Sequence, residues 1–292
     1  MEMVYSIAPN DSAWYKHWKD INDELKLDEE IEPWFLMGSF WPILAILLLY
    51  FQFIFKTGPN MMKNRPPFKL KGIIIIYNIF QIILNASIVY YSAFMPGFIT
   101  YIWRESCNPD VVPTSPQETE YLYFFKLGSW WYLIAKVLDL LDTVFFVLRK
   151  KQSHVSFLHV YHHTSMIHLV WFGFKYIRPL HTCFPGVLNC LIHVIMYSYY
   201  LVSILIPGIG RKNLLIKAII TRLQIVQFIM ILGHTLVVYR SCPVPRSVIY
   251  IELFHVTMFL VLFINFYTKE YTSGNKQKSE ITETETETKK MS

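Results

Sequence analysis

Apolar residues occur along most of the chain in long blocks, and short polar segments separate these blocks. A bilayer core of about 30 Å requires about 20 apolar residues in a helix that rises 1.5 Å per residue. Seven stretches reach this length, and we expect each to be a transmembrane helix. Their approximate bounds are 34–55, 72–91, 121–148, 157–174, 184–206, 214–239 and 248–267. Six helices are the alternative, because the third stretch carries charge and the next two contain histidine.

Composition supports this interpretation and excludes the common soluble classes. Hydrophobic residues make up 53% of the chain and charged residues only 16%, against about 25% charged residues in soluble domains. The mean hydropathy is +0.33. The net charge of +6 is spread over short clusters between apolar blocks, so we expect no nucleic-acid partner. The predicted fold is an all-α polytopic membrane protein, a bundle of seven transmembrane helices that encloses a polar chamber.

The chain divides into three parts by composition. We expect a lumenal N-terminal segment over residues 1–33, a seven-helix transmembrane domain over 34–268, and a disordered cytosolic tail over 269–292. The first 32 residues lack the apolar core of a cleavable signal peptide. An uncleaved transmembrane helix is therefore expected to direct the chain to the membrane.

Lysine and arginine in the short connections predict the orientation. They are enriched after the first, third and fifth apolar stretches and in the tail, which places these segments in the cytosol and the N-terminus in the lumen. The tail ends in Lys289-Lys290-Met291-Ser292, the KKxx pattern of endoplasmic-reticulum membrane proteins. On the lumenal side, Asn10 begins an N-glycosylation sequon, and we expect its modification.

Polar and ionisable residues lie inside the predicted membrane helices, where an ionisable group costs at least about 2.5 kcal/mol. Asp139, His162, His193 and Gln224 come from four different helices. At 1.5 Å per residue, all four fall roughly 14–20 Å below the cytosolic surface. We therefore expect one polar chamber that opens to the cytosol.

Histidine allows three kinds of chemistry in such a chamber: metal binding, acid–base catalysis and nucleophilic attack. A di-iron oxygenase would need more histidine boxes than the chain has, since only His193 is well placed beside the cluster at 159–163. A desaturase or hydroxylase, and a seven-helix receptor or transporter, are the alternative functions. Cys190, three residues before His193, is an alternative nucleophile. We favour catalysis without metal or cofactor.

Four ordered motifs make the chain resemble the very-long-chain fatty acid elongases, the membrane condensing enzymes of the endoplasmic reticulum. Residues 159–163 read HVYHH and match the HxxHH box, and residues 136–143 match KxxExxDT except that Asp139 stands where Glu is usual. Residues 193–200 match HxxMYxYY, and residues 221–227 match TxxQxxQ. The resemblance covers about residues 34–270.

The resemblance implies that acyl-CoA and malonyl-CoA condense with loss of CO2 to give 3-oxoacyl-CoA. An acyl-histidine intermediate is then expected on His162, with His193 facing it as a base or oxyanion donor. The other candidate site residues that the motifs supply are His159, His163, Asn189, Gln224, Lys136, Asp139, Asp142 and Tyr199. For Lys136, an internal ion pair with Asp139 is an equal alternative to a role in catalysis.

The two substrates need different surroundings. The acyl chain requires an apolar tunnel, expected within the last five helices. The CoA phosphates require cations at the cytosolic mouth, where the candidates are Arg149, Lys150, Lys151, Arg211, Lys212 and Arg222. Expected partners are these substrates, the membrane and the other enzymes of the elongation cycle, and a homo- or hetero-oligomer is an open alternative.

The predicted topology also pairs two cysteines. It places Cys107 and Cys242 in lumenal loops, and the lumen of the endoplasmic reticulum is oxidising. We expect a Cys107–Cys242 disulfide that braces the lumenal end of the tunnel, and two free thiols are the alternative.

Overall fold

The computed structural model describes residues 30–108, 111–177, 180–206, 214–244 and 246–273. Several predicted features lie outside these ranges. They are the sequon at Asn10, the cations Arg211 and Lys212, the KKxx lysines Lys289 and Lys290, and most of the tail.

The described residues are helical, with no β-strand among them, and each of the seven apolar stretches contains a helix. The predicted all-helical class is therefore confirmed. The elements, in chain order, are α2 (Trp41–Gln52), η1 (Phe53–Thr57), α3 (Gly58–Met62), α4 (Lys71–Phe94), α5 (Phe98–Glu105), α6 (Pro116–Leu148), η2 (Gln152–His154), α7 (Phe157–Phe172), η3 (Gly173–Ile177), η4 (Leu180–Thr182), α8 (Cys183–Leu205), α10 (Leu214–Ser241), α11 (Arg246–Tyr267) and η5 (Thr268–Ser273).

Five helical segments of the described chain are long and apolar enough to cross a membrane: 41–62, 71–94, 180–205, 214–241 and 246–271. Helices α6 and α7 form where two further spans are predicted, but they do not belong to this set. Helix α6 carries Lys136, Asp139 and Asp142 within two turns, and α7 has only 16 residues. The protein is thus a multi-pass membrane protein by its helices, and the count of seven spans stays a prediction.

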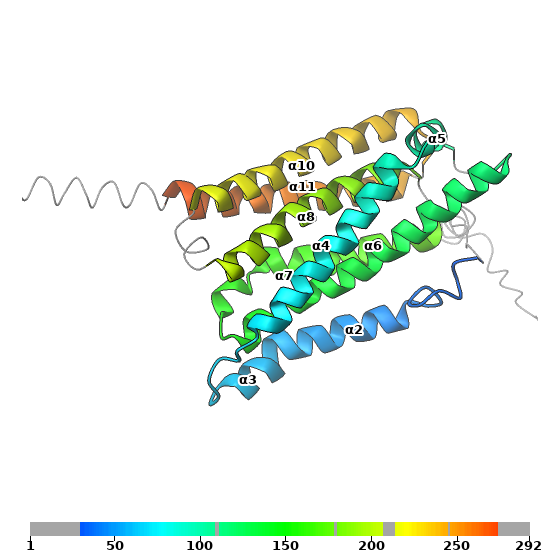
Figure 1. The fold of residues 1–292 in the computed structure, drawn as a ribbon. Helices are drawn as coiled ribbons and strands as arrows, with labels where there is room; N and C mark the ends of the chain where they lie inside the picture. The colour runs from blue at the N-terminus through cyan, green and yellow to red at the C-terminus, as the bar shows by residue number, and fades with distance from the viewer. Residues whose placement is uncertain (1–29, 109–110, 178–179, 207–213, 245, 274–292) are drawn as a thin grey trace, which may run out of the picture.

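The helices pack in an elongated bundle (Figure 1). The antiparallel pair α10 and α11 forms one side, α2 forms the opposite side, and α4, α6, α7 and α8 lie between them. The main apolar core joins α2 to α6 and α7 through Ile43, Leu133 and Ile167, each fully buried. Ile31 and Met37 also belong to this core, so the bundle begins a few residues before the predicted boundary at residue 34. At the other boundary, helical structure continues through η5 beyond residue 268.

Local sequence explains where α6 begins. Ser115 caps the helix by accepting a hydrogen bond from the backbone N–H of Glu118 at 3.2 Å, and Pro116 follows at the first turn. Glu118 in turn accepts hydrogen bonds from the backbone and hydroxyl of Thr114, each at 2.7 Å, and from Arg104. These donors lower the pKa of Glu118 to about 2. The first turn of α6 is thereby tied to the end of α5.

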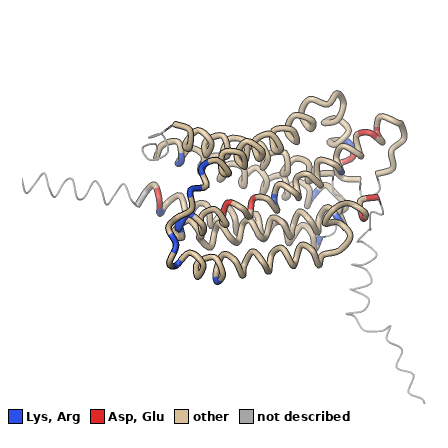
Figure 2. The backbone as a smooth tube through the Cα atoms, turned by 60° about the horizontal axis from the view of Figure 1, so that its bottom comes forward, with Lys and Arg blue, Asp and Glu red and all other residues tan. Residues whose placement is uncertain are grey.

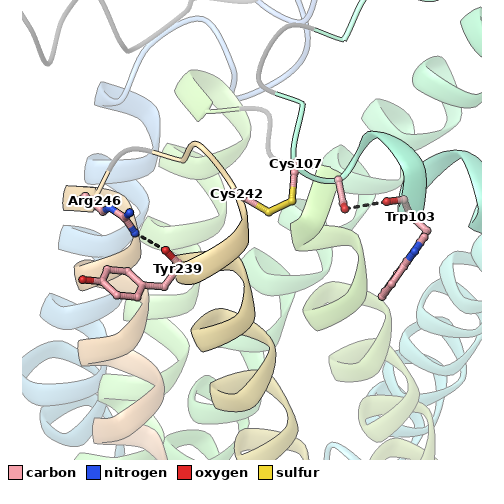
Figure 3. The surroundings of a disulfide bond; sticks show 6 residues. Trp103, Cys107, Tyr239, Cys242 and Arg246 are labelled. Atoms are coloured by element: carbon pink, nitrogen blue, oxygen red, sulfur yellow. Dashed lines mark hydrogen bonds between the residues drawn. A yellow bond between two sulfur atoms is a disulfide. The ribbon is translucent and has the colours of Figure 1, made fainter.

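A Cys107–Cys242 disulfide joins the segment after α5 to the end of α10, with Cα atoms 4.6 Å apart (Figure 3). This is the pair that the sequence analysis expects. It connects two parts of the chain that are 135 residues apart in sequence. We call this the disulfide end of the bundle.

The opposite end is rich in lysine and arginine (Figure 2). The segment between α3 and α4 carries Lys63, Arg65 and Lys69, and the connection after α6 carries Arg149 and Lys150. Lys150 Nζ donates a hydrogen bond to the Lys63 carbonyl at 3.4 Å, which joins the two connections. We call this the basic end of the bundle.

Candidate active site

A buried carboxylate, Asp139 on α6, is the centre of the polar side chains inside the bundle. It has no exposed surface. Its oxygens accept hydrogen bonds from Lys136 Nζ at 3.1 Å, Gln81 Nε2 at 2.7 Å and the Tyr197 hydroxyl at 2.8 Å. Three different helices, α4, α6 and α8, therefore meet at one carboxylate.

Two histidines complete this group. Lys136 Nζ lies 3.3 Å from His193 Nε2, and His193 Nδ1 lies 3.6 Å from Asp139 Oδ2. His163 Nδ1 lies 4.0 Å from the same oxygen. We define the Asp139 cluster as Gln81, Lys136, Asp139, His163, His193 and Tyr197. Each of the other five members contacts Asp139, so each would lose a contact if the carboxylate were removed.

Helical spacing brings these residues together. Lys136 and Asp139 are three residues apart on α6, and His193 and Tyr197 are four apart on α8, so each pair lies on one helix face. The Ser156 hydroxyl accepts a hydrogen bond from the backbone N–H of His159 at 3.2 Å and so fixes the start of α7. This cap defines the first turn of the helix that carries all three histidines of the box.

A second polar group adjoins the cluster toward the basic end. The Tyr197 hydroxyl also lies 2.8 Å from Asp142 Oδ2, within hydrogen-bond distance. His159 Nε2 lies 3.0 Å from the Thr143 hydroxyl, which accepts a hydrogen bond from Tyr50 at 2.9 Å. These contacts hold His159 in place, and its ring centre lies 4.4 Å from that of His163.

His162, the middle histidine of the box, has different surroundings from its neighbours. Its ring lies among Phe228, Phe259 and Phe263, with centroid distances of 6.1, 4.8 and 5.8 Å. It is 8% exposed, and no described residue forms a hydrogen bond or ion pair with it. Both ring nitrogens therefore lack a hydrogen-bond partner within the described chain, and the ring lies 5.3 Å from that of His163.

A mostly apolar cavity of about 220 Å³ lies next to the aromatic side chains around His162 and extends toward the disulfide end, and His162 itself is not among the residues that line it. Phe228 and Phe259, which contact His162, also form part of its wall. Tyr132 and Asn189 line it nearest the Asp139 cluster, and the Tyr132 hydroxyl donates a hydrogen bond to Asn189 Oδ1 at 3.0 Å. The Lys136 ammonium lies 4.9 Å from the centre of the Tyr132 ring. The arrangement thus places His162, which has no hydrogen-bond partner in the described chain, between a charged cluster and the wall of an apolar cavity.

Comparison with known proteins identifies the family of this chain. The sequence profile described as the GNS1/SUR4 family matches residues 35–279. The chain belongs to the GNS1/SUR4 family. The predicted resemblance to the very-long-chain fatty acid elongases is confirmed by relatives that carry this name.

Three relatives illustrate the match. Human very long chain fatty acid elongase 4 is 38% identical over 280 residues, which cover 94% of this chain and 84% of the human protein. Very long chain fatty acid elongase 7 of Drosophila melanogaster is 35% identical over 262 residues, 89% of this chain and 77% of the relative. Mouse very long chain fatty acid elongase 1 is 38% identical over 253 residues, 85% of this chain and 88% of the relative. The match thus covers all four motifs in each case.

Within this family fold, the structure brings most of the predicted residues together. Lys136, Asp139, His163 and His193 form one cluster, and Asp142, His159, His162 and Asn189 adjoin it. Two predicted residues lie elsewhere. Gln224 Nε2 is 3.9 Å from the Met196 sulfur, and the Tyr199 hydroxyl is buried with no partner among the described residues. The tyrosine of this motif that contacts the carboxylates is Tyr197.

Sequence reasoning missed the contribution of α4. Asn78, Gln81 and Asn85 are buried on one face of this helix, and Tyr77 lies with its hydroxyl 3.1 Å from that of Tyr197. A signal was available, because these amides are spaced three and four residues apart in an otherwise apolar span. They show that the second predicted helix belongs to the site.

The remaining candidates differ in their positions. Arg149, Lys150 and Lys151 lie at the basic end, whereas Arg222 donates a hydrogen bond to the Tyr267 hydroxyl at 2.6 Å. Cys190 is fully buried in α8. No group of three or more His, Cys, Asp or Glu suited to hold a metal ion occurs among the described residues. The expectation of no cofactor stays a prediction.

Proposed function

We propose that the protein is a fatty acid elongase that condenses a long-chain acyl-CoA with malonyl-CoA and carries the acyl group on His162. The products are 3-oxoacyl-CoA, CO2 and free CoA. The observation that supports this most directly is the position of His162, whose ring lies 5.3 Å from that of His163 in the Asp139 cluster and packs against Phe228 and Phe259 of the cavity wall. A nucleophile for acyl transfer needs both a polar side for the thioester and an apolar side for the chain.

In the first half-reaction, a nitrogen of His162 attacks the thioester carbonyl. The carbon–sulfur bond breaks, the proton of the imidazole passes to the sulfur, and CoA leaves as the thiol. The acyl group stays on the ring as an acyl-imidazole. The aromatic rings around His162 exclude water, which would otherwise hydrolyse this intermediate.

In the second half-reaction, malonyl-CoA loses CO2 and keeps the electron pair as an enolate. The enolate carbon attacks the acyl carbonyl, the acyl–nitrogen bond breaks, and His162 takes up a proton. Negative charge develops on oxygen in both half-reactions and requires nearby donors. Lys136 and His193, which lie 3.3 Å apart, are the donors best placed to stabilise it.

The Asp139 cluster then has a positioning role. Asp139 holds the Lys136 ammonium by an ion pair of 3.1 Å and lies 3.6 Å from His193. Hydrogen bonds from Gln81 and Tyr197 fix the carboxylate from two other helices. Because its donors are already oriented, the site needs little reorganisation when charge develops.

The apolar cavity is the proposed acyl tunnel. It starts at the Phe228 and Phe259 rings beside His162 and is lined mainly by apolar side chains of α6, α7, α8, α10 and α11. An acyl group attached to His162 can extend into it away from the charged cluster. The disulfide ties α10 to the segment after α5 and so braces the far end of the proposed tunnel.

The proposed placement in the cell follows from the two ends of the bundle. The basic end faces the cytosol, where Arg149, Lys150 and Lys151 meet the CoA phosphates. The disulfide end faces the oxidising lumen of the endoplasmic reticulum. Seven spans, a lumenal N-terminus and a cytosolic KKxx tail complete this topology. The other enzymes of the elongation cycle are its proposed partners.

Malonyl-CoA incorporation by microsomes that contain the protein tests the proposal. We expect wild type to lengthen long-chain acyl-CoA by two carbons from labelled malonyl-CoA, and His162→Ala to abolish this. His168→Ala is the matched control, because His168 is on the same helix but exposed and packed against Phe40. It should retain activity. Full condensation by His162→Ala, or loss of labelled acyl product only in Cys190→Ala, would refute the role of His162.

A further inference from the structure

The apolar cavity contains a second, smaller group of polar side chains that the proposed mechanism does not use. Thr235 of α10 and Glu252 and His255 of α11 line its wall. No Lys or Arg occurs among the described residues that line the cavity. A carboxyl group in an apolar cavity is costly unless it is paired or serves a ligand, so Glu252 calls for an explanation.

Helix register places Thr235 and Glu252 at one level. Helices α10 and α11 form an antiparallel pair. Phe228 lies 13 residues before the end of α10, and Phe259 lies 13 residues after the start of α11. Their rings meet at 5.7 Å, which fixes the register. Thr235 and Glu252 are each six residues from the same two helix ends and seven residues from the ring on their own helix, so they lie at one level and on the same helix faces as the two rings. This level lies about 10 Å from the Phe228 and Phe259 rings toward the disulfide end.

The free hydrogen-bonding positions of this group are acceptors. The Thr235 hydroxyl donates a hydrogen bond to the Ile231 carbonyl at 3.0 Å, so the lone pairs of its oxygen can still accept a hydrogen bond. His255 Nδ1 donates to the Ile251 carbonyl at 2.8 Å, which leaves Nε2 of the neutral ring as an acceptor. Glu252 forms no hydrogen bond or ion pair with any described residue, and a carboxyl group accepts hydrogen bonds in either protonation state. These three acceptors are complementary to a ligand group that donates a hydrogen bond.

We propose that Glu252, with Thr235 and His255, binds a hydroxyl group on the acyl chain, so that the enzyme takes hydroxylated long-chain acyl-CoA as a preferred substrate class. This inference rests on the proposed function, because it requires the cavity to hold the acyl chain. The hydroxyl lies in the middle of the chain, since the polar level is about 10 Å from the ring layer beside His162. A hydrocarbon chain leaves the same acceptors unpaired in an apolar cavity, which is unfavourable.

A pair of substrates that differ by one hydroxyl tests the proposal. Ricinoleoyl-CoA carries a mid-chain hydroxyl that oleoyl-CoA lacks. Both are given in competition to wild type and to Glu252→Met, which keeps a side chain of similar length without acceptor oxygens, and Glu252→Gln, which keeps an acceptor. We expect wild type and Glu252→Gln to prefer ricinoleoyl-CoA, and Glu252→Met to lose about ten-fold of that preference. Thr235→Val should lose part of it, and its matched control Thr257→Val, on the exposed side of α11, should lose none.

A binding measurement separates this proposal from the proposed function. The thermal stabilisation of purified protein by each acyl-CoA, without malonyl-CoA, reports binding alone. We expect ricinoleoyl-CoA to stabilise wild type more than oleoyl-CoA does, and Glu252→Met to remove the difference. Equal stabilisation of wild type by the two ligands, or an unchanged preference in Glu252→Met, would overturn the hydroxyl site even if elongation is normal. Absence of elongation with a preserved binding preference would instead count against the proposed function.

Discussion

The Asp139 cluster and the apolar cavity are adjacent but are built in opposite ways. In the cluster the carboxylate is held from three helices, since Asp139 has Lys136 on its own helix and Gln81 and Tyr197 on two others as partners. In the cavity, the wall is mainly apolar and a few acceptors lack partners within the described chain. The cluster therefore fixes geometry for chemistry, whereas the cavity leaves space and unsatisfied groups for a ligand. His162 lies between the two. It is buried like the residues of the cluster, but like the acceptors of the cavity it lacks a hydrogen-bond partner in the described chain.

The largest effect is expected when the cluster loses its carboxylate. Asp139→Ala leaves the Lys136 ammonium buried without its ion-pair partner, which costs about 3–5 kcal/mol. We expect a large drop in the midpoint of thermal unfolding in detergent and no condensation. The double variant Lys136→Met with Asp139→Leu replaces both charges with apolar groups and should recover much of the stability without activity. A wild-type midpoint for Asp139→Ala would contradict the central position of this carboxylate.

A smaller effect is expected when one hydroxyl of the cluster is removed. Tyr197→Phe deletes the group that contacts both Asp139 and Asp142 at 2.8 Å. Hydrogen bonds to charged groups contribute about 1.5–3 kcal/mol, so we expect a clear loss of stability and of the condensation rate. Tyr199→Phe is the comparison, because that hydroxyl is buried without a partner in the described chain. Should Tyr199→Phe be the more damaging of the two, the structure would have assigned the wrong tyrosine.

The mildest change is expected in the cavity, where filling should alter the product and leave the chemistry intact. Gly128 lines the cavity, and a Cβ there would meet open space. It lies eight residues from Lys136 on α6, about 12 Å toward the disulfide end. Gly128→Phe should shorten the longest product, measured by chromatography of the elongated acyl groups. Gly233→Phe is the control, since Gly233 is exposed on α10 and also faces open space, and unchanged products in both variants would place the acyl chain elsewhere.

Sequence predicted the helices and the charged half of the site better than it predicted the cavity. The HxxHH box and the charges of α6 are conspicuous because ionisable groups are rare in membrane helices. The contribution of α4 was missed, since Gln81 and Tyr77 are uncharged and belong to no motif that the sequence analysis used. The choice between Tyr197 and Tyr199 depends on which face of α8 meets α6. The sequence places the tunnel only coarsely, within the last five helices, because the side chains that form the cavity come from helices that are distant in sequence, and the place of Glu252 in its wall does not follow from a linear pattern.

Detection of the acyl-enzyme tests the central claim most directly. Purified protein is incubated with acyl-CoA in the absence of malonyl-CoA, and both the released CoA and the mass of the intact protein are measured. Our account predicts one CoA released per active site, a mass increase of one acyl group that maps to His162, and neither signal in His162→Ala. The adduct should disappear with formation of 3-oxoacyl-CoA when malonyl-CoA is added. Release of CoA only after malonyl-CoA is supplied, or an adduct on Cys190, would contradict the account.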